Sequence, residues 1–226
     1  MKITYLGHAS LSIEAHGQVI IIDPYISENP LASHIDVDKL EADYILVTHA
    51  HGDHILDVER IAKRTGAKVV SNFEIVNHFA AKGIEGHPMN TGGSWKFDFG
   101  TLHMVNALHS SSFPDGSYGG NPVGFVIETK HHKIYVAGDT ALTTDMRLIP
   151  EVIGTLDLAV LPIGDNFTMG ISSAVKAAQY LECRMVLGYH YDTFGYIEID
   201  KEQAYKKFAG KHIDLHLLPI GDSIKL

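Results

Sequence analysis

Hydrophobic runs of strand length that end in a histidine or an aspartate recur along this 226-residue chain. The first run, residues 43–48, leads directly into the sequence His-Ala-His-Gly-Asp-His. A short run rich in Ile and Val is typical of a buried strand. Three later runs end in the same way, and they lead to His109, Asp139 and His190. Because open α/β sheets gather ligand-binding groups at the carboxyl ends of their strands, we expect these side chains to share one site.

The first cluster contains His49, His51, Asp53 and His54. Imidazole and carboxylate groups are ligands that zinc and similar divalent metals accept. In an extended backbone alternate side chains share a face, so His49, His51 and Asp53 are expected to converge. A turn into a helix would direct His54 to a second nearby point. The alternative, a histidine-rich solvated loop, would not need to follow a buried strand. The cluster therefore favours a shared two-metal centre over one closed structural metal site.

These residues resemble the ligand set of the metallo-β-lactamase superfamily. The motif His-x-His-x-Asp-His is intact, and the three later ligands match as single residues. Within the superfamily the chain is similar to a small bacterial and archaeal group of metal-dependent hydrolases related to the ascorbate-6-phosphate lactonases. The resemblance covers essentially the whole chain, and further matching segments are residues 5–10, 22–24, 137–140, 161–170 and 189–194.

The resemblance implies an α/β fold, a four-layer αββα sandwich with two mixed sheets face to face and the metals at one edge. It also implies that His49, His51 and His109 hold one metal, that Asp53, His54 and His190 hold a second, and that Asp139 bridges both. The expected cofactors are two divalent ions per chain, zinc first, with manganese or iron as alternatives. Two metals about 3.5–4 Å apart make hydroxide available near neutral pH, and this hydroxide is the expected nucleophile.

Two catalytic residues are predicted. Asp53 could orient the hydroxide, and His8, which follows a strand and Gly7, could protonate a leaving group or bind a substrate anion. The alternative for His8 is a turn histidine hydrogen-bonded to backbone. Asp23 ends a strand and either orients a ligand histidine or simply closes a turn. Candidates for the substrate mouth follow two strand ends, although turn chemistry is the favoured alternative for any single one of them. They are Ser110, Ser111, Ser112, Asp165, Asn166, Thr168 and Met169.

The amino-acid composition limits which classes of binding partner are expected. The formal net charge is −9 and no Lys/Arg-rich block is present, so nucleic acid is an unfavoured partner. The one cysteine, Cys183, is expected to be a buried thiol. No apolar run approaches the roughly 20 residues that span a bilayer, and the first residues do not resemble a signal peptide. We expect a cytoplasmic protein without membrane insertion that acts on a small molecule; a homo-oligomer is compatible with the sequence.

The chain is expected to form one domain, residues 1–226, built of two related halves. In each half a hydrophobic strand ending in aspartate is followed by a second strand that ends at a site residue. Predicted strands cover residues 2–6, 10–14, 18–22, 43–48, 67–70, 94–99, 102–108, 123–129, 133–137, 158–163, 185–189, 213–218 and 223–226. Predicted helices cover residues 55–64, 72–82, 144–153, 172–181 and 201–208, with a loop over 110–122.

The function that these patterns favour is hydrolysis of a small, anionic ester, lactone or phosphodiester by a binuclear metal centre. An RNA-processing nuclease of the RNase Z type uses the same ligand set, but the missing basic block counts against it. A metal-binding protein without turnover is the third hypothesis, which the complete ligand set disfavours. Activity on β-lactams is disfavoured because no export signal is recognised.

Overall fold

The computed structural model describes residues 1–226, and its strands form two seven-stranded sheets. The first sheet has the spatial order β14 (Ser223–Lys225), β1 (Lys2–Gly7), β2 (Ser10–Ala15), β3 (Gln18–Ile22), β4 (Tyr44–Leu46), β5 (Lys68–Asn72) and β6 (Gly86–Met89). The second has the order β13 (Asp214–His216), β12 (Met185–Tyr189), β11 (Leu158–Pro162), β10 (Lys133–Val136), β9 (Val123–Glu128), β8 (Gly100–Asn106) and β7 (Ser94–Phe97).

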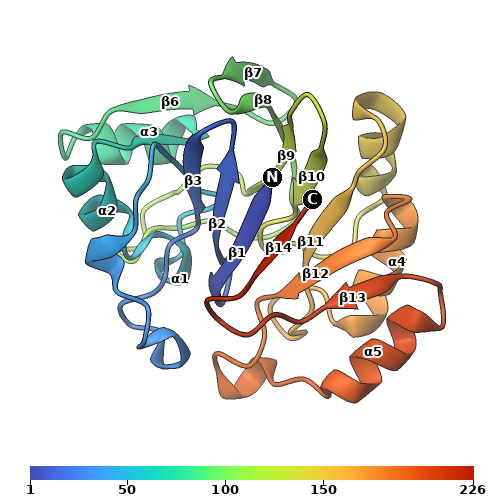
Figure 1. The fold of residues 1–226 in the computed structure, drawn as a ribbon. Helices are drawn as coiled ribbons and strands as arrows, with labels where there is room; N and C mark the ends of the chain where they lie inside the picture. Colours follow the sequence, from blue (N-terminus) through green and yellow to red (C-terminus); the bar gives the residue numbers. More distant parts are fainter.

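The two sheets repeat the same pairing pattern. β1 to β3 pair antiparallel and β3 to β6 pair parallel. In the second sheet β7 to β10 pair antiparallel and β10 to β13 pair parallel. The last strand, β14, crosses to the first sheet and pairs antiparallel with β1, so the two termini lie side by side (Figure 1). The two sheets therefore have related topologies, and the division of the chain into two related halves stays a prediction.

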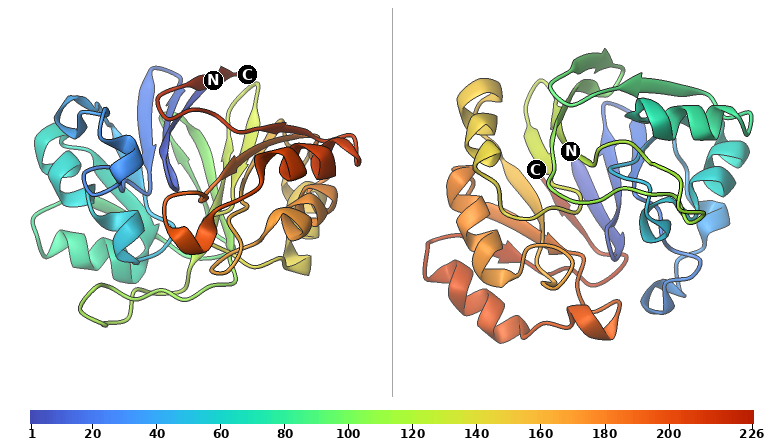
Figure 2. Two further views of the ribbon diagram at one scale, coloured as in Figure 1. Left: turned by 90° about the horizontal axis from the view of Figure 1, so that it is seen from below. Right: turned by 180° about the vertical axis from the view of Figure 1, so that it is seen from behind.

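Helices cover the outer face of each sheet, and a shared apolar core lies between the sheets (Figure 2). α2 (Val58–Thr65) and α3 (Phe73–Ala80) pack on the first sheet, and α4 (Ile171–Tyr180) and α5 (Lys201–Ala209) pack on the second. The inner core draws on both sheets, with Leu11 and Ile20 from one and Phe125 and Leu187 from the other. The predicted αββα sandwich is confirmed, and the inner core is shared by both sheets.

Local signals in the sequence set several helix ends. Asn72 caps α3 because its Oδ1 accepts a hydrogen bond from the Ile75 amide at 2.9 Å. Asp200 caps α5 in the same way, with the Gln203 amide at 2.9 Å. Gly66 ends α2 with a φ of +77°, in the left-handed region that glycine adopts without a Cβ clash. The predicted helices at these positions are confirmed to within a few residues.

The predicted helix over residues 55–64 is wrong at its start. The chain instead forms a single turn, α1 (Gly52–Ile55), and then restarts at Val58. Asp57 separates the two because its carboxylate accepts hydrogen bonds from the amides of Ile26 and Ser27, at 2.7 and 2.9 Å, rather than capping α2. A long-range contact therefore outweighs the helical spacing of the apolar residues.

The predicted helix over residues 144–153 is also wrong in kind. The structure has a 3₁₀ turn, η3 (Thr144–Arg147), followed by a π-helical turn, η4 (Ile149–Ile153). Pro150 has no backbone N–H to donate and disfavours a regular α-helix across this segment. The turn closes when the Gly154 amide donates to the Ile149 carbonyl at 3.3 Å, a bond that spans five residues.

Some short elements carry no recognisable sequence signal. Strand β6 contains Pro88 and would not be assigned as a strand from its residues, but it lies at the sheet edge, where proline is tolerated. The 3₁₀ turns η1 (Pro30–Ala32), η2 (Val37–Lys39) and η5 (Gly195–Ile197) were likewise not predicted. Cys183 is buried, as expected. None of the helices combines the length and apolarity that crossing a membrane would require.

Candidate metal centre

The predicted site residues follow the carboxyl ends of strands from both sheets. His49 lies beyond β4, His109 beyond β8, Asp139 beyond β10 and His190 immediately after β12. The structure brings these four together: the Asp139 Oδ2 atom lies 3.9 Å from His49 Nε2, 3.6 Å from His109 Nε2 and 3.0 Å from His190 Nε2. The strand-end pattern in the sequence therefore identified residues that are neighbours in space.

One group of potential ligands contains His49, His51 and His109, whose ligand atoms lie within 4.8 Å of one another. The His49 Nε2 and His51 Nδ1 atoms are 3.0 Å apart. Asp53 does not join this group, so the expectation that it shares a face with His49 and His51 is wrong. The extended backbone that the expectation requires ends at His51, where α1 begins.

A second group contains His8, Asp53, His54 and His190, again with ligand atoms within 4.8 Å of one another. The helical turn α1 directs Asp53 and His54 to this side, and His54 Nε2 is 3.8 Å from Asp53 Oδ2. Asp139 lies between the two groups, because its Oδ2 is also 3.5 Å from His54 Nε2. These groups contain the two sets of ligands that the resemblance implied, with His8 added to the second set, and a third group, Asp23, His49 and His54, joins the two. The assignment of these residues to two metals stays a prediction.

Buried hydrogen bonds fix two of the imidazoles. The Asp23 Oδ2 atom accepts from His54 Nδ1 at 2.9 Å and from the Thr48 hydroxyl at 2.6 Å, and Asp23 Oδ1 accepts from the Thr48 amide at 2.8 Å. The Thr48 oxygen in turn lies 3.0 Å from His49 Nδ1 and can accept its proton. Both histidines therefore keep Nε2 free to face the cluster. Asp23 orients a histidine, the first of the two predicted alternatives.

His8 contacts Asp53 from the protein interior. It is 1% exposed, its Nε2 lies 3.0 Å from Asp53 Oδ2, and its Nδ1 lies 2.9 Å from the Thr193 hydroxyl. Its φ of +52° is unusual for a residue with a Cβ. The alternative of a turn histidine whose ring bonds to backbone is wrong, because both ring nitrogens face side chains.

The pKa values of the histidines in the cluster are shifted in different directions. Burial lowers the pKa of His49, His51 and His109, so they stay neutral, the form that binds metal. Burial alone would lower the pKa of His54 as well, but the carboxylates of Asp139 and Asp53 hold it well above the ordinary value. The carboxylates of Asp53 and Asp139 thus place negative charge beside His54 Nε2, where a bound cation would be compensated by it.

The unpaired atoms of the cluster fit metal ions. His54 Nε2, His190 Nε2 and Asp139 Oδ1 are buried and have no hydrogen-bond partner. The His190 Nε2 and Asp139 Oδ2 atoms are close, yet their alignment does not make a hydrogen bond. Buried polar atoms without partners cost free energy, and coordination of metal ions by these nitrogen and oxygen atoms would remove that cost. The imidazole and carboxylate set is the chemistry that zinc, manganese and iron accept.

A cavity of about 670 Å³ opens beside the cluster. Its lining includes Ser110 from the predicted mouth and three aromatic side chains, Phe167, Phe194 and Tyr196. The other residues considered for the mouth do not line the cavity, which agrees with the favoured alternative that they serve local turn structure. Ser111 bonds to the Ala50 amide and the Gly119 carbonyl, Ser112 pairs with Tyr118, Asp165 and Asn166 form the turn before Phe167, and Met169 is buried.

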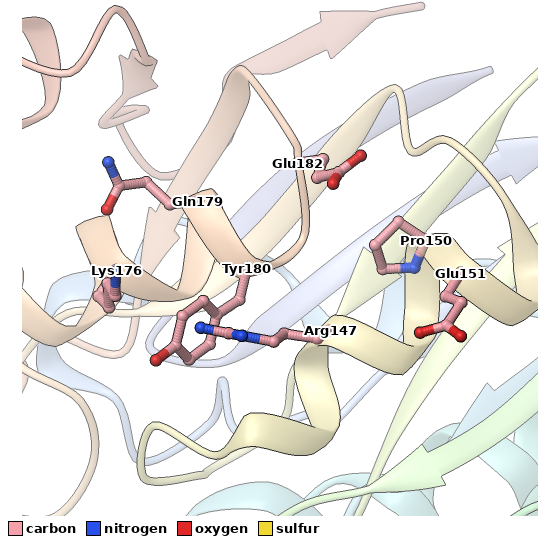
Figure 3. A pocket seen from close by; sticks show the side chains of 7 residues that line it. All are labelled: Arg147, Pro150, Glu151, Lys176, Gln179, Tyr180 and Glu182. Carbon is pink, nitrogen blue, oxygen red and sulfur yellow. The ribbon is translucent and has the colours of Figure 1, made fainter.

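A second hollow of similar volume, about 650 Å³, lies away from this cluster between α4 and η4. Figure 3 shows that the Arg147 guanidinium lies over the Tyr180 ring, at 4.1 Å from the ring centroid. The other charged residues that line this hollow are Lys176, Glu151 and Glu182, so the hollow contains both positive and negative charges. No group of potential metal ligands faces it. Size does not distinguish the two hollows, but the side-chain chemistry assigns the candidate centre to the first.

Sequence reasoning missed several residues of the site. Thr48 and Thr193 are ordinary polar residues in the sequence, and their roles depend on partners at positions 23 and 8. Thr48 could have been suspected, because it separates a buried strand from the first histidine. The aromatic residues of the cavity gave no periodic or spacing signal, since Phe167 and Phe194 lie in loops and Tyr196 lies in the short 3₁₀ turn η5.

Comparison with known proteins agrees with this geometry. Residues 18–191 match the model of the beta-lactamase superfamily domain. UPF0173 metal-dependent hydrolases of Flavobacterium johnsoniae and Christiangramia forsetii are 63% and 60% identical to this chain, each over 100% of both chains. The solved structure of Igni18, a novel metallo hydrolase from the archaeon Ignicoccus hospitalis, has a TM-score of 0.89 at 34% identity, covering 99% of this chain and 97% of that one. With a ligand cluster at the strand ends and relatives of full length, this chain belongs to the beta-lactamase superfamily and, within it, to the UPF0173 metal-dependent hydrolases.

Proposed function

We propose that this metal-dependent hydrolase works with a binuclear centre. His49, His51 and His109 would hold one ion, Asp53, His54 and His190 the other, and Asp139 would bridge them. The observation that carries the proposal is the position of Asp139 Oδ2, which lies 3.0 to 3.9 Å from ring nitrogens of four histidines drawn from both groups. Zinc is the first candidate metal, and manganese and iron are the alternatives.

Two bound divalent ions would supply a hydroxide nucleophile near neutral pH and stabilise charge that develops on the attacked oxygen. Side chains of the protein would orient this nucleophile. Asp53 lines the cavity and could orient the nucleophile through a carboxylate oxygen. His8 does not line the cavity, so we assign it a positioning role: its Nε2–H would hold Asp53 Oδ2, and Thr193 would donate to its Nδ1. This differs from the proton donor that the sequence suggested.

The substrate that suits this site is a small ester, lactone or phosphodiester whose reacting group carries or develops negative charge. The cavity has the volume of a small-molecule site, about 670 Å³. Its lining contains no Lys or Arg, so the metals would be the main positive charge near the reacting group. The chain as a whole carries a formal net charge of −9, which disfavours long-range attraction of a polyanion.

The protein is expected to purify with about two transition-metal ions per chain, because the donor set exceeds what one tetrahedral ion needs. Elemental analysis of the protein, before and after chelation and reloading, measures this. His109→Ala and His190→Ala should each retain about one ion, since each removes a ligand from a different group. A single firmly held ion, with the second position empty even under excess metal, would contradict the binuclear proposal.

Structured RNA is not expected to be the main target. Turnover of a small phosphodiester or lactone should continue in the presence of a tRNA precursor, and it should depend only weakly on salt, because few phosphate contacts are available. The measurement is a competition assay at low and high ionic strength. Efficient cleavage of the RNA at one position, with a steep salt dependence and no turnover of small substrates, would favour the nuclease alternative instead.

A further inference from the structure

The cavity beside the candidate metal centre has an aromatic rim, made up of Phe167, Phe194 and Tyr196. Phe167 is 51% exposed and Tyr196 is 78% exposed, and their ring centroids are 6.3 Å apart at 77°. Phe194 is half-buried, and its ring lies edge-on to the His8 ring at 5.2 Å. The aromatic rim therefore extends from solvent to the imidazole that contacts Asp53.

The loop that presents Phe167 is held by the rest of the fold. The Asp165 amide donates to the Met169 carbonyl at 3.1 Å, and the Met169 amide donates to the Thr140 carbonyl at 3.1 Å. Asp165 and Asn166 have φ values of +64° and +53°, in a region that costs free energy for residues with a Cβ. Such strain is concentrated at binding sites in proteins. Here it serves to turn an apolar ring toward water beside the cavity.

The loop that presents Phe194 and Tyr196 is also held in place by hydrogen bonds and an ion pair. The Asp192 amide donates to the Ile197 carbonyl at 2.8 Å, and the Asp192 carboxylate accepts from the Ile199 amide at 3.0 Å and pairs with Lys201 at 2.9 Å. Two rings on a fixed loop lose little conformational entropy when they bind a ligand, which is the property of a preorganised site.

The remaining lining gives a substrate no other strong anchor. Beyond the ligand residues it contains only Ser110 and Gly195, and neither Lys nor Arg lines it. A charged group on the non-reacting part of a substrate would therefore meet aromatic carbon. An apolar group would be removed from water there, and an aromatic one could also stack edge-on or offset against the rings.

We propose that the aromatic rim binds an apolar, preferentially aromatic, group on the non-reacting side of the substrate. This rests on the proposed function, in which the metal centre holds the reacting group. It deepens that function because it names the substrate class: a small ester, lactone or phosphodiester that carries an aryl or comparable apolar substituent. Phe167 and Tyr196 would determine specificity without taking part in bond cleavage.

The test uses three phosphonates that share one metal-binding group. Phenylphosphonate, methylphosphonate and carboxymethylphosphonate are titrated into the zinc-loaded protein by calorimetry, with the metal-free protein as reference. Phenylphosphonate is expected to bind roughly tenfold more tightly than methylphosphonate, a difference of about 1.4 kcal/mol. Carboxymethylphosphonate is expected to gain nothing over methylphosphonate, because no Lys or Arg lines the cavity to pair with its second charge once the phosphonate occupies the metals.

Variants locate the effect. The double variant Phe167→Ala/Tyr196→Ala should lose the phenyl preference and keep the affinity for methylphosphonate, and both residues are exposed enough to be replaced without a core cavity. Trp95→Ala is the matched control, since Trp95 is an aromatic residue of β7 that is 55% exposed and lies outside this cavity. It should retain the preference.

Each outcome decides the proposal. If phenyl- and methylphosphonate bind equally and both require zinc, the proposal of an aromatic binding rim is wrong, while the proposal of a metal centre still holds. Tighter binding of carboxymethylphosphonate, or a phenyl preference that survives in the double variant, would overturn it as well. If no phosphonate binds in a zinc-dependent way, the metal anchor itself fails and the rim proposal falls with it.

Discussion

Asp139→Ala is expected to lower kcat/KM by more than the roughly 10²–10⁴-fold that one general acid–base group contributes. The reason lies in the position of the carboxylate, which is 3% exposed and approaches His49, His54, His109 and His190 at once. Its loss would remove a negative charge from between two cations and take a ligand from each. The measurement is kcat/KM together with metal content per chain.

His8→Ala and Asp139→Asn are the comparisons for this variant. His8 would act through Asp53, so its loss should cost about 10–100-fold, the range typical of groups that orient a ligand from behind. Asp139→Asn keeps the side-chain shape and removes the charge, so it separates electrostatic bridging from simple occupancy. Wild-type metal content and wild-type rates in Asp139→Ala would rule out the bridging role.

Much of the fold could be predicted because local and global preferences agree. The strand runs, the Asn72 cap and the Gly66 terminus each depend on residues within a few positions of one another. The prediction errors occur where a contact with a residue distant in sequence determines the local structure. Asp57 interrupts the helix before α2 to bind amides 30 and 31 residues earlier in the chain. The spacing of apolar residues alone does not contain that information.

The residues of the site likewise fall into those that local sequence predicts and those that depend on distant partners. The ligand residues could be predicted because each follows a hydrophobic run, and parallel strands bring such positions to one edge. The residues that support them could not, since the pairs Thr48 with Asp23 and Thr193 with His8 join segments that are remote in sequence. Nor could the aromatic rim be predicted, because an exposed Phe in a loop has no distinguishing neighbours until the loops at residues 164–170 and 190–197 are placed together.

Asp23→Asn is expected to weaken metal binding by roughly 10–100-fold, as loss of a group that orients a ligand histidine typically does. Asp23 is fully buried and accepts from His54 Nδ1, from the Thr48 amide and from the Thr48 hydroxyl. Asparagine keeps one acceptor oxygen but loses the negative charge and turns an N–H₂ donor toward one of these donors, so the set of hydrogen bonds that holds His54 Nε2 toward Asp139 would be weakened. Competition with a chromophoric chelator measures the affinity, and thermal unfolding of the metal-free proteins measures stability. Asp38→Asn is the control, because that carboxylate pairs with Arg60 on the surface. A fall in thermal stability of Asp23→Asn without any change in metal affinity would show that Asp23 holds the loop but does not tune the ligand.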